Sequence, residues 1–160
     1  MKIIVDAMGG DNAPQAPVMG AIQANKEYGV DIILVGRGED ILEVLRREGL
    51  DEVPAGVSIT HAGQVVEMCD NPATAFKEKK DSSLTVGLNL VKNGEGDAFV
   101  SAGSTGALLA GATLLVKRIK GIRRAAMAPV VPTGGGGAVL VDGVRFEKND
   151  VAQVRLHVEF

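Results

Sequence analysis

Short apolar runs alternate with longer amphipathic segments along the first two thirds of the chain. Five runs have the length of β-strands: Ile3 to Ala7, Asp31 to Val35, Val57 to His61, Ala98 to Ser101 and Ala138 to Val141. Two of them are nearly continuous apolar stretches, which is typical of strands in a parallel sheet covered on both faces. The pattern therefore predicts strands that alternate with helices.

Four helices are expected between and after these strands. The first three carry residues of one face at helical spacing. The first helix is expected from Gln15 to Tyr28, with Val18, Ala21, Ile22 and Asn25 on one face. The second lies between Glu39 and Gly49, with Ile41, Leu42, Val44 and Leu45, and the third lies between Asp81 and Gly94, with Leu84, Leu88 and Val91. The fourth follows Ser104 and Thr105. Strands joined by helices imply right-handed crossovers, so we predict a doubly wound, mostly parallel α/β sandwich, Rossmann-like and incomplete. Ligands of such folds bind beyond the carboxyl ends of the strands.

The overall composition fits one domain and argues against some partners. The 160 residues are 46% hydrophobic, enough for a single core. A net charge of -3 gives no basic surface, and one Tyr, four Phe and no Trp leave few aromatic side chains on which bases could stack, so we expect no nucleic-acid partner. Cys69 is the only cysteine, which leaves no internal disulfide and favours a cytoplasmic location.

Two stretches of the chain could be membrane-directed, and neither is expected to be. Asp6 and Asp11 interrupt the amino terminus, so no secretory signal is expected. The stretch from Ala98 to Val116 has no charge and approaches the roughly 20 residues that span a bilayer. Because small polar residues lie in its middle, a strand, a turn and a helix are the better interpretation.

A glycine pair follows the first strand. Gly9 and Gly10 let the backbone take positive φ and approach a ligand closely. Asp11 or Asn12 is expected to cap the next helix, which Pro14 helps to begin. This is the layout of a ligand-binding turn between a strand and a helix.

The fourth strand leads into a second candidate turn. Gly103, Ser104, Thr105 and Gly106 precede a helix whose unpaired N–H groups and dipole favour an anion such as phosphate. Ordinary capping of the helix by Ser104 or Thr105 is an equally good interpretation. The string is neither a Walker A loop nor a Gly-x-Gly-x-x-Gly motif.

A lysine pair gives a third candidate. Lys79 and Lys80 come just ahead of the helix that begins near Ser82, where they could neutralise a phosphate or a developing oxyanion. The plain alternative is a solvated charged turn.

Other residues suggest less. Cys69 is expected to be a small, partly buried residue rather than a nucleophile, and His61 and His157 form no metal constellation, so no metal site is predicted. Ser101 and Ser104 do not make a Gly-x-Ser-x-Gly elbow. Two further segments have open interpretations. The glycines from 134 to 137 form either a turn or a phosphate loop. A basic cluster is either a solvated helix end or a surface for an acidic partner, and it consists of Lys117, Arg118, Lys120, Arg123 and Arg124.

Several of these strings together resemble one family. They are Asp6-Ala7-Met8-Gly9-Gly10-Asp11-Asn12-Ala13-Pro14, the stretch from Pro72 to Leu84, the stretch from Asp97 to Ala110, and Ile122 to Pro129 with Pro132-Thr133 beyond. The chain is similar over about residues 1–143 to the bacterial phosphate acyltransferases called PlsX, whose usual Asn is replaced here by Ser104.

The resemblance implies a reaction and roles for the candidate residues. Members transfer a fatty acyl group from acyl carrier protein to inorganic phosphate, which makes an acyl phosphate for phospholipid synthesis and needs no cofactor. The implied catalytic residues are Lys79, Lys80, Asp6, Asp11 and Asn12, and the implied phosphate-binding residues are Gly103, Ser104, Thr105, Gly106, Gly9, Gly10 and Ser82. A homodimer and peripheral membrane association are implied for the full-length protein.

The resemblance stops near residue 143. Residues 144–160 diverge from the family pattern, and we expect a frameshifted or truncated product there. Two alternatives to the implied function stay open: an enzyme like phosphate acetyltransferase that uses acyl coenzyme A, and an inactive fragment that keeps anion or carrier-protein binding. A nucleotide-dependent oxidoreductase is less favoured, because no acidic ribose partner follows the Gly9-Gly10 turn at the expected distance.

Overall fold

A computed structural model describes residues 1–118, 120–121, 125, 130–133 and 136–139. The chain divides into two compact units, Met1–Lys117 and Arg118–Phe160, which are treated separately below. The first unit contains the candidate turns at Gly9 and Gly103 and the lysine pair.

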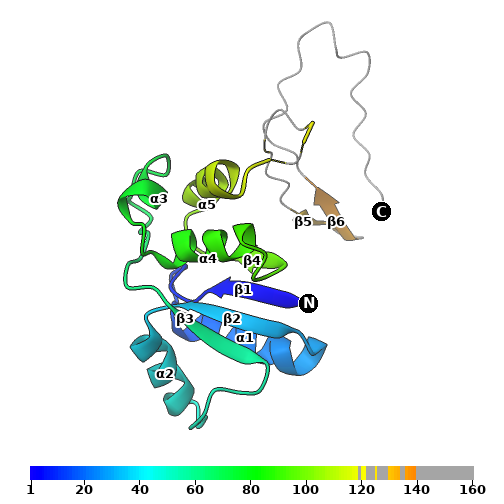
Figure 1. The fold of residues 1–160 in the computed structure, drawn as a ribbon. Helices are drawn as coiled ribbons and strands as arrows, with labels where there is room; N and C mark the ends of the chain where they lie inside the picture. Colours follow the sequence, from blue (N-terminus) through cyan, green and yellow to red (C-terminus); the bar gives the residue numbers. More distant parts are fainter. Residues whose placement is uncertain (119, 122–124, 126–129, 134–135, 140–160) are drawn as a thin grey trace, which may run out of the picture. The chain divides into compact units, whose positions relative to one another are not determined.

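The first unit is built on a four-stranded parallel sheet. Its strands are β1 (Lys2–Asp6), β2 (Asp31–Gly36), β3 (Val57–His61) and β4 (Ala98–Val100), in the spatial order β3-β2-β1-β4 (Figure 1). In register, Ile4 of β1 lies between Ile33 of β2 and Phe99 of β4. All pairs are parallel, which confirms the predicted sheet.

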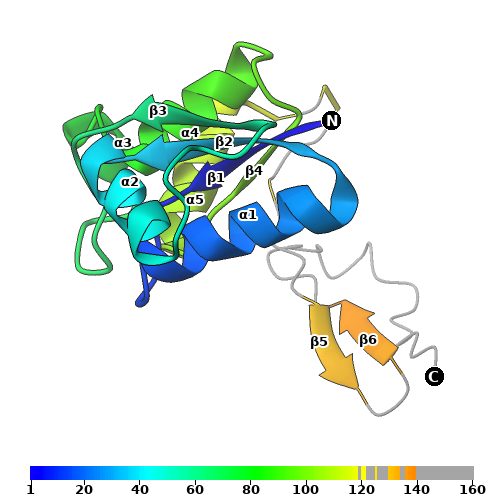
Figure 2. The ribbon, with the colours of Figure 1, turned by 90° about the horizontal axis from the view of Figure 1, so that it is seen from below.

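Helices cover both faces of this sheet (Figures 1 and 2). They are α1 (Gln15–Tyr28), α2 (Gly38–Arg47), α3 (Ala75–Glu78), α4 (Ser83–Lys92) and α5 (Thr105–Gly111), which continues as one π-helical turn over Ala112–Val116. Helices α1 and α2 pack on one face, α4 packs on the other, and α5 packs on α4. The predicted α/β sandwich is therefore confirmed.

The strand side chains alternate between these two layers, as the two-residue period requires. Val5, Ile32 and Leu34 join the core under α1 and α2, and Ile4, Ile33 and Val35 join the core under α4. Because both sets are buried, β1 and β2 read as continuous apolar runs.

The helix ends follow the sequence signals with one exception. Gly29 ends α1 in a left-handed conformation, with φ of 63°, and Ser82 caps α4 by accepting from the Thr85 N–H. The expected side-chain cap of α1 by Asp11 or Asn12 is wrong. Pro14 is the N-cap residue, and only the backbone carbonyl of Asn12 takes part, accepting from the Ala16 N–H.

The described residues of the second unit include an antiparallel hairpin. Strand β5 (Val130–Thr133) pairs with β6 (Gly136–Val139), and β6 takes the place of the strand expected over Ala138 to Val141. The predicted glycine loop falls partly within β6, since Gly136 and Gly137 belong to it. Gly134, Gly135 and the expected divergent tail, residues 144–160, lie outside the described residues.

The uncharged stretch from Ala98 to Val116 is not one helix. It forms β4, a turn, and α5 with its π-helical extension, as predicted. Among the residues that the structure describes, no helix combines the length and the apolar run needed to cross a bilayer.

Candidate functional site

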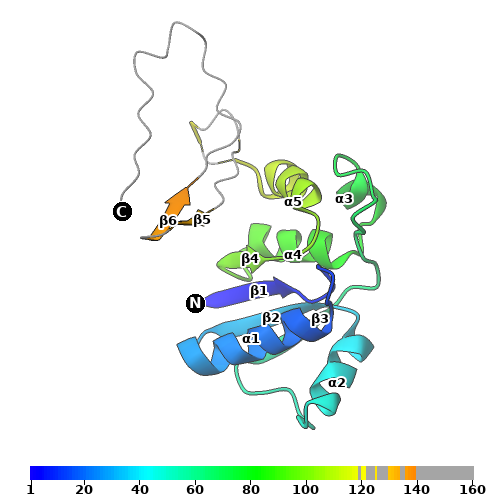
Figure 3. The same cartoon turned by 180° about the vertical axis from the view of Figure 1, so that it is seen from behind.

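The candidate turns meet where the order of the strands reverses. From β1 the chain passes through α1 to β2 on one side, whereas β4 lies on the other side of β1 (Figure 3). Connections on either side of such a reversal diverge, and the crevice at the carboxyl ends of the strands is the usual ligand site of an open α/β sheet. Gly9 and Gly10 follow β1 at this point, and the residues from Ser101 to Ser104 follow β4.

The two turns touch through their backbones. A Cβ atom on Gly9 would lie 2.6 Å from Asp6 Oδ2 and 2.9 Å from the Gly103 nitrogen. Gly10 has φ of 103° and lies against Ala102. Glycine is therefore needed at position 9 for close approach and at position 10 for its conformation.

Asp6 links the two turns. Its carboxylate is 3% exposed, and it accepts from the Met8 N–H over 3.0 Å and from the Ser101 hydroxyl over 2.7 Å. The Ser101 oxygen in turn accepts from the Gly103 N–H over 3.1 Å. Sequence reasoning missed the role of Ser101, and its only signal was a hydroxyl placed directly after a strand.

The start of α5 is a capped helix end. The Ser104 hydroxyl accepts from the Ala107 N–H over 3.4 Å and is 6% exposed. The capping interpretation of Ser104 is confirmed, whereas anion binding there stays a prediction. Thr105 and Gly106 are exposed at the first turn of the helix.

The lysine-containing segment reaches the same region through its beginning. A Cβ atom on Gly106 would lie 3.0 Å from Cβ of Pro72, so the start of this segment packs against the start of α5. Ser82 is fully buried at its other end, and its hydroxyl donates to the Thr85 hydroxyl as well as capping α4. Three of the four segments that carry the resemblance are therefore neighbours.

The two lysines differ in their surroundings. Lys79 Nζ donates to an Asp70 carboxylate oxygen over 2.5 Å and to the Val65 carbonyl over 2.9 Å. The hydrogen bond between them raises the pKa of Lys79 and lowers the pKa of Asp70, helped at Asp70 by the Glu67 N–H. Lys80 is exposed and makes no hydrogen bond or ion pair with the described residues.

Asp11 and Asn12 complete the region. Both are exposed and line a shallow pocket of about 380 Å³ together with Gly9, Gly10 and Ala102. The pocket is bounded by the first turn and by the residue before Gly103, so it lies at the junction of the two turns.

The remaining candidates lie elsewhere or outside the described residues. Cys69 is exposed, so its expected partial burial is wrong; it sits in the irregular stretch between β3 and α3, away from any core. No group of His, Cys, Asp or Glu with metal-site geometry occurs among the described residues. Of the basic residues, Lys117, Arg118 and Lys120 are exposed, and Arg123 and Arg124 lie outside the described residues, as does His157.

Comparison with known proteins shows the family of this chain. A family model described as fatty acid synthesis protein matches residues 1–153. The chain belongs to this family. The resemblance inferred from the sequence is therefore confirmed, and the loops around Gly9 and Gly103 are part of the family's sequence.

Curated relatives in the family carry the name phosphate acyltransferase. The protein of Desulfitobacterium hafniense is 51% identical over 142 residues, a match that covers 89% of this chain and 42% of that protein. The protein of Thermoanaerobacter pseudethanolicus is 47% identical over 143 residues, covering 89% and 41%, and that of Clostridioides difficile is 46% identical over 141 residues, covering 88% and 41%. This chain thus spans about two fifths of the length of these relatives.

Proposed function

We propose that this chain supplies the phosphate-binding loops of an acyltransferase, which moves a fatty acyl group from acyl carrier protein to inorganic phosphate. The product is an acyl phosphate for phospholipid synthesis. One observation carries the proposal: in a member of this family, two glycine turns joined by Asp6 and Ser101 meet at the strand reversal. The relatives' name supports transfer of an acyl group with phosphate.

The reaction requires little covalent chemistry from the protein. A phosphate oxygen attacks the thioester carbonyl, a C–O bond forms, the C–S bond breaks, and the thiolate leaves and takes a proton. Phosphate is already a usable nucleophile near neutral pH. The protein therefore needs only to position it and to stabilise the tetrahedral oxyanion, without a cofactor or a covalent enzyme intermediate.

Phosphate is assigned to the turn from Gly103 to Gly106, facing Gly9 and Gly10. The exposure of Thr105 and Gly106 supports this, since the first N–H groups of a helix have no partner within it. Ser82 was predicted to bind phosphate directly. Because its hydroxyl is buried and caps α4, we assign it an indirect role, holding the segment that bears the lysines.

Charge stabilisation is assigned to Lys80 ahead of Lys79. Lys79 is already paired with Asp70, whereas the ammonium of Lys80 faces solvent. Asp6 organises the two turns through its hydrogen bonds. Asp11 and Asn12 are assigned to the rim of the pocket, where they would orient the incoming group.

Acyl carrier protein is the proposed donor and is strongly acidic. The exposed residues Lys117, Arg118 and Lys120 support docking of an acidic partner by electrostatic attraction. A cytoplasmic location, a homodimer and peripheral membrane contact belong to the same proposal for the full-length protein.

The test uses a chimera in which this chain's first 142 residues replace the matching part of the Desulfitobacterium hafniense relative. Lys80→Ala and Ser104→Ala are each expected to lower kcat/KM at least tenfold, and Ser104→Ala to raise the KM for phosphate. Lys26→Ala on α1, an exposed lysine away from the turns, is the matched control.

If both variants keep the turnover and the phosphate dependence of the parent chimera, the roles assigned to Lys80 and Ser104 are wrong. Assays with acyl carrier protein and coenzyme A thioesters side by side identify the donor, and faster turnover of the coenzyme A ester would favour the acetyltransferase-like alternative. Acyl phosphate made by the 160-residue chain alone would reject the inactive-fragment alternative.

A further inference from the structure

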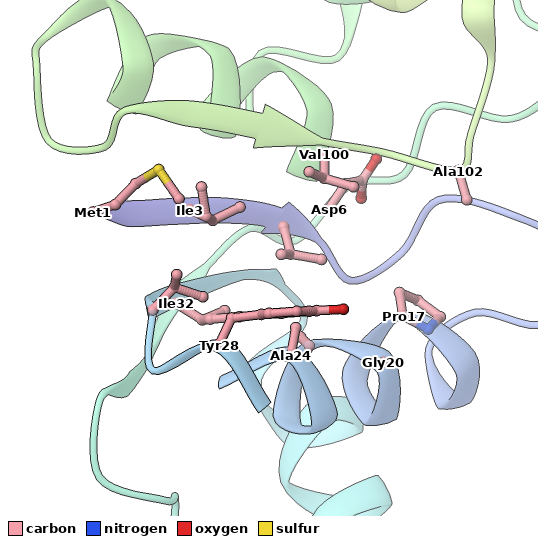
Figure 4. Close-up of a pocket in the computed structure, with 13 residues that line it drawn as sticks. Met1, Ile3, Asp6, Pro17, Gly20, Ala24, Tyr28, Ile32, Val100 and Ala102 are labelled. Carbon is pink, nitrogen blue, oxygen red and sulfur yellow. The ribbon is translucent and has the colours of Figure 1, made fainter. Parts of the chain in front are cut away.

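An apolar groove of about 660 Å³ runs along α1 (Figure 4). Ile3 and Val5 of β1 and Val100 of β4 form its floor, and Gly20 and Ala24 of α1 form one wall. Asp6 and Ala102 line the end nearest the glycine turns, and Met1, Tyr28 and Val30 line the other. The groove therefore follows the length of β1 on the side of the sheet that α1 covers only in part.

Within Met1–Lys117, helices α1 and α2 leave the part of this sheet face over β1 and β4 without full helical cover. All-parallel sheets are almost always buried on both faces by helices. Here Val100 is 53% exposed and Tyr28 is 69% exposed, although both lie on the apolar groove. Within the described residues β4 also pairs along one edge only, with β1, so its other edge has no strand beside it.

Gly20 provides a second, independent observation. The glycines inside α4 and α5 all have a close neighbour. A Cβ atom on Gly87, Gly106 or Gly111 would lie 2.2, 3.0 or 2.7 Å, respectively, from a side-chain atom. A Cβ on Gly20 would meet nothing within 4 Å. Glycine inside a helix is unfavourable relative to alanine, and a close-packed neighbour is the usual reason to keep it.

We propose that this groove seats a helix from the remainder of a full-length family member, packed against α1 at Gly20. The chain matches only 42% of its Desulfitobacterium hafniense relative, so more than half of that protein is chain that this structure does not contain. Packed helices approach to about 8–10 Å between axes, and a glycine at the contact permits the closest approach. The inference depends on membership of the family and not on the proposed reaction.

A polypeptide suits the surface better than a fatty acyl chain does. The apolar floor continues to the edge of β4, whose backbone N–H and C=O groups a neighbouring strand can pair and a hydrocarbon cannot. Pro17, Gly20, Ala24 and Tyr28 recur at three- and four-residue spacing, which makes a continuous strip along α1. The occupant is therefore an amphipathic helix whose apolar face meets this strip, with an adjoining strand beside β4.

The test is two-chain assembly. The 160-residue chain is co-expressed with the remaining portion of the Desulfitobacterium hafniense relative, and only this chain carries an affinity tag. The two are expected to copurify in equal amounts. Hydrogen exchange in the complex is expected to slow in residues 17–28 and 98–100 relative to the chain alone.

Gly20→Glu places a charged side chain over the groove and is expected to weaken assembly at least tenfold. Gln23→Glu adds the same charge to an exposed position of α1 that does not line the groove, and it is expected to assemble like the unaltered chain. Circular dichroism of both variants alone confirms that they fold. Because the readout is assembly, it is separate from the turnover assays above.

Three results would overturn the proposal. One is that the unaltered pair does not copurify. Another is that the chain forms a dimer that Gly20→Glu dissociates, which would make the occupant a second copy. The last is that palmitate binds the groove stoichiometrically and Gly20→Glu abolishes that binding while assembly is unaffected.

Discussion

Glycine serves opposite purposes at two positions of this chain. At Gly9 the space for a side chain is already filled by Asp6 and by the backbone of Gly103. At Gly20 the space is open, and no described neighbour needs the missing side chain. A single substitution to alanine should therefore have opposite effects on stability at the two positions.

Gly9→Ala is expected to destabilise the chain by about 1–3 kcal/mol, because overpacking forces the two turns apart. Gly20→Ala is expected to stabilise the isolated chain by about 0.5–1 kcal/mol, the difference in helix preference between the two residues. Urea unfolding followed by circular dichroism measures both. Equal shifts of the same sign would contradict the packing at the two glycines.

Asp6 is the residue on which both turns depend. Asp6→Ala leaves the Met8 N–H and the Ser101 hydroxyl without their acceptor in a buried place, which is expected to cost about 1–3 kcal/mol. Asp11→Ala removes an exposed carboxylate nearby and should change the unfolding free energy by less than about 0.5 kcal/mol. A similar loss in both variants, measured in urea, would show that the hydrogen bonds of Asp6 do not hold the turns.

Residue types predicted part of this site and could not predict the rest. Gly9 and Gly10 stood out because glycines directly after a strand allow close approach to a ligand, whereas Asp6 was named only through the family resemblance. The hydrogen bond from Ser101 to Asp6 joins residues 95 apart in sequence, so only the pairing of β1 with β4 reveals it. The pairing of Lys79 with Asp70 was hidden for a similar reason, since an irregular loop brings the two together.

At the scale of elements, periodicity was a good guide where a helix or strand buries a regular face. Helix α1 has the predicted bounds because its apolar residues and Gly29 agree. Helix α3 was missed, since its four residues are too few to show a helical period. Strand β5 was also missed, and it pairs with β6 in an antiparallel hairpin that local patterns alone did not indicate.

The ion pair between Asp70 and Lys79 ties the loop before α3 to the end of that helix, and its effect should depend on pH. The pKa of Asp70 is lowered in the folded chain, so its stabilising effect is complete above the unfolded value of about 3.9 and is lost as pH falls through the folded value. The pKa of Lys79 is raised, so its contribution is lost only when pH rises beyond about 10.4.

Asp70→Asn is therefore expected to lower Tm near neutral pH, and the difference from the unaltered chain should shrink as the pH falls below about 4. Thermal unfolding across this range gives the comparison. Asp51→Asn, at an exposed carboxylate outside any ion pair, is the control. A Tm difference for Asp70→Asn that stays constant into acid would mean that the ion pair does not stabilise the fold.

At the scale of the molecule, the order of the strands decides what the chemistry-bearing turns can do together. The sequence predicted a parallel sheet, but it did not predict that β4 lies beside β1 instead of beside β3. That order places the Gly9 and Gly103 turns at the reversal, where a crevice opens. It also leaves one face of β4 exposed beside α1, which local sequence patterns could not reveal.

The apolar cores drawn from the described residues all lie within the first unit, from Ile3 to Val116. They include both layers of the sandwich, and 117 residues is an ordinary length for one domain. A chain ended after Lys117 should therefore fold by itself, with one cooperative urea transition and a midpoint close to that of the 160-residue chain. Far-UV circular dichroism and hydrogen exchange of β1 and β2 report whether the sheet forms. A truncated chain that is unfolded, or that loses protection in these central strands, would mean that the second unit contributes to the stability of the sheet.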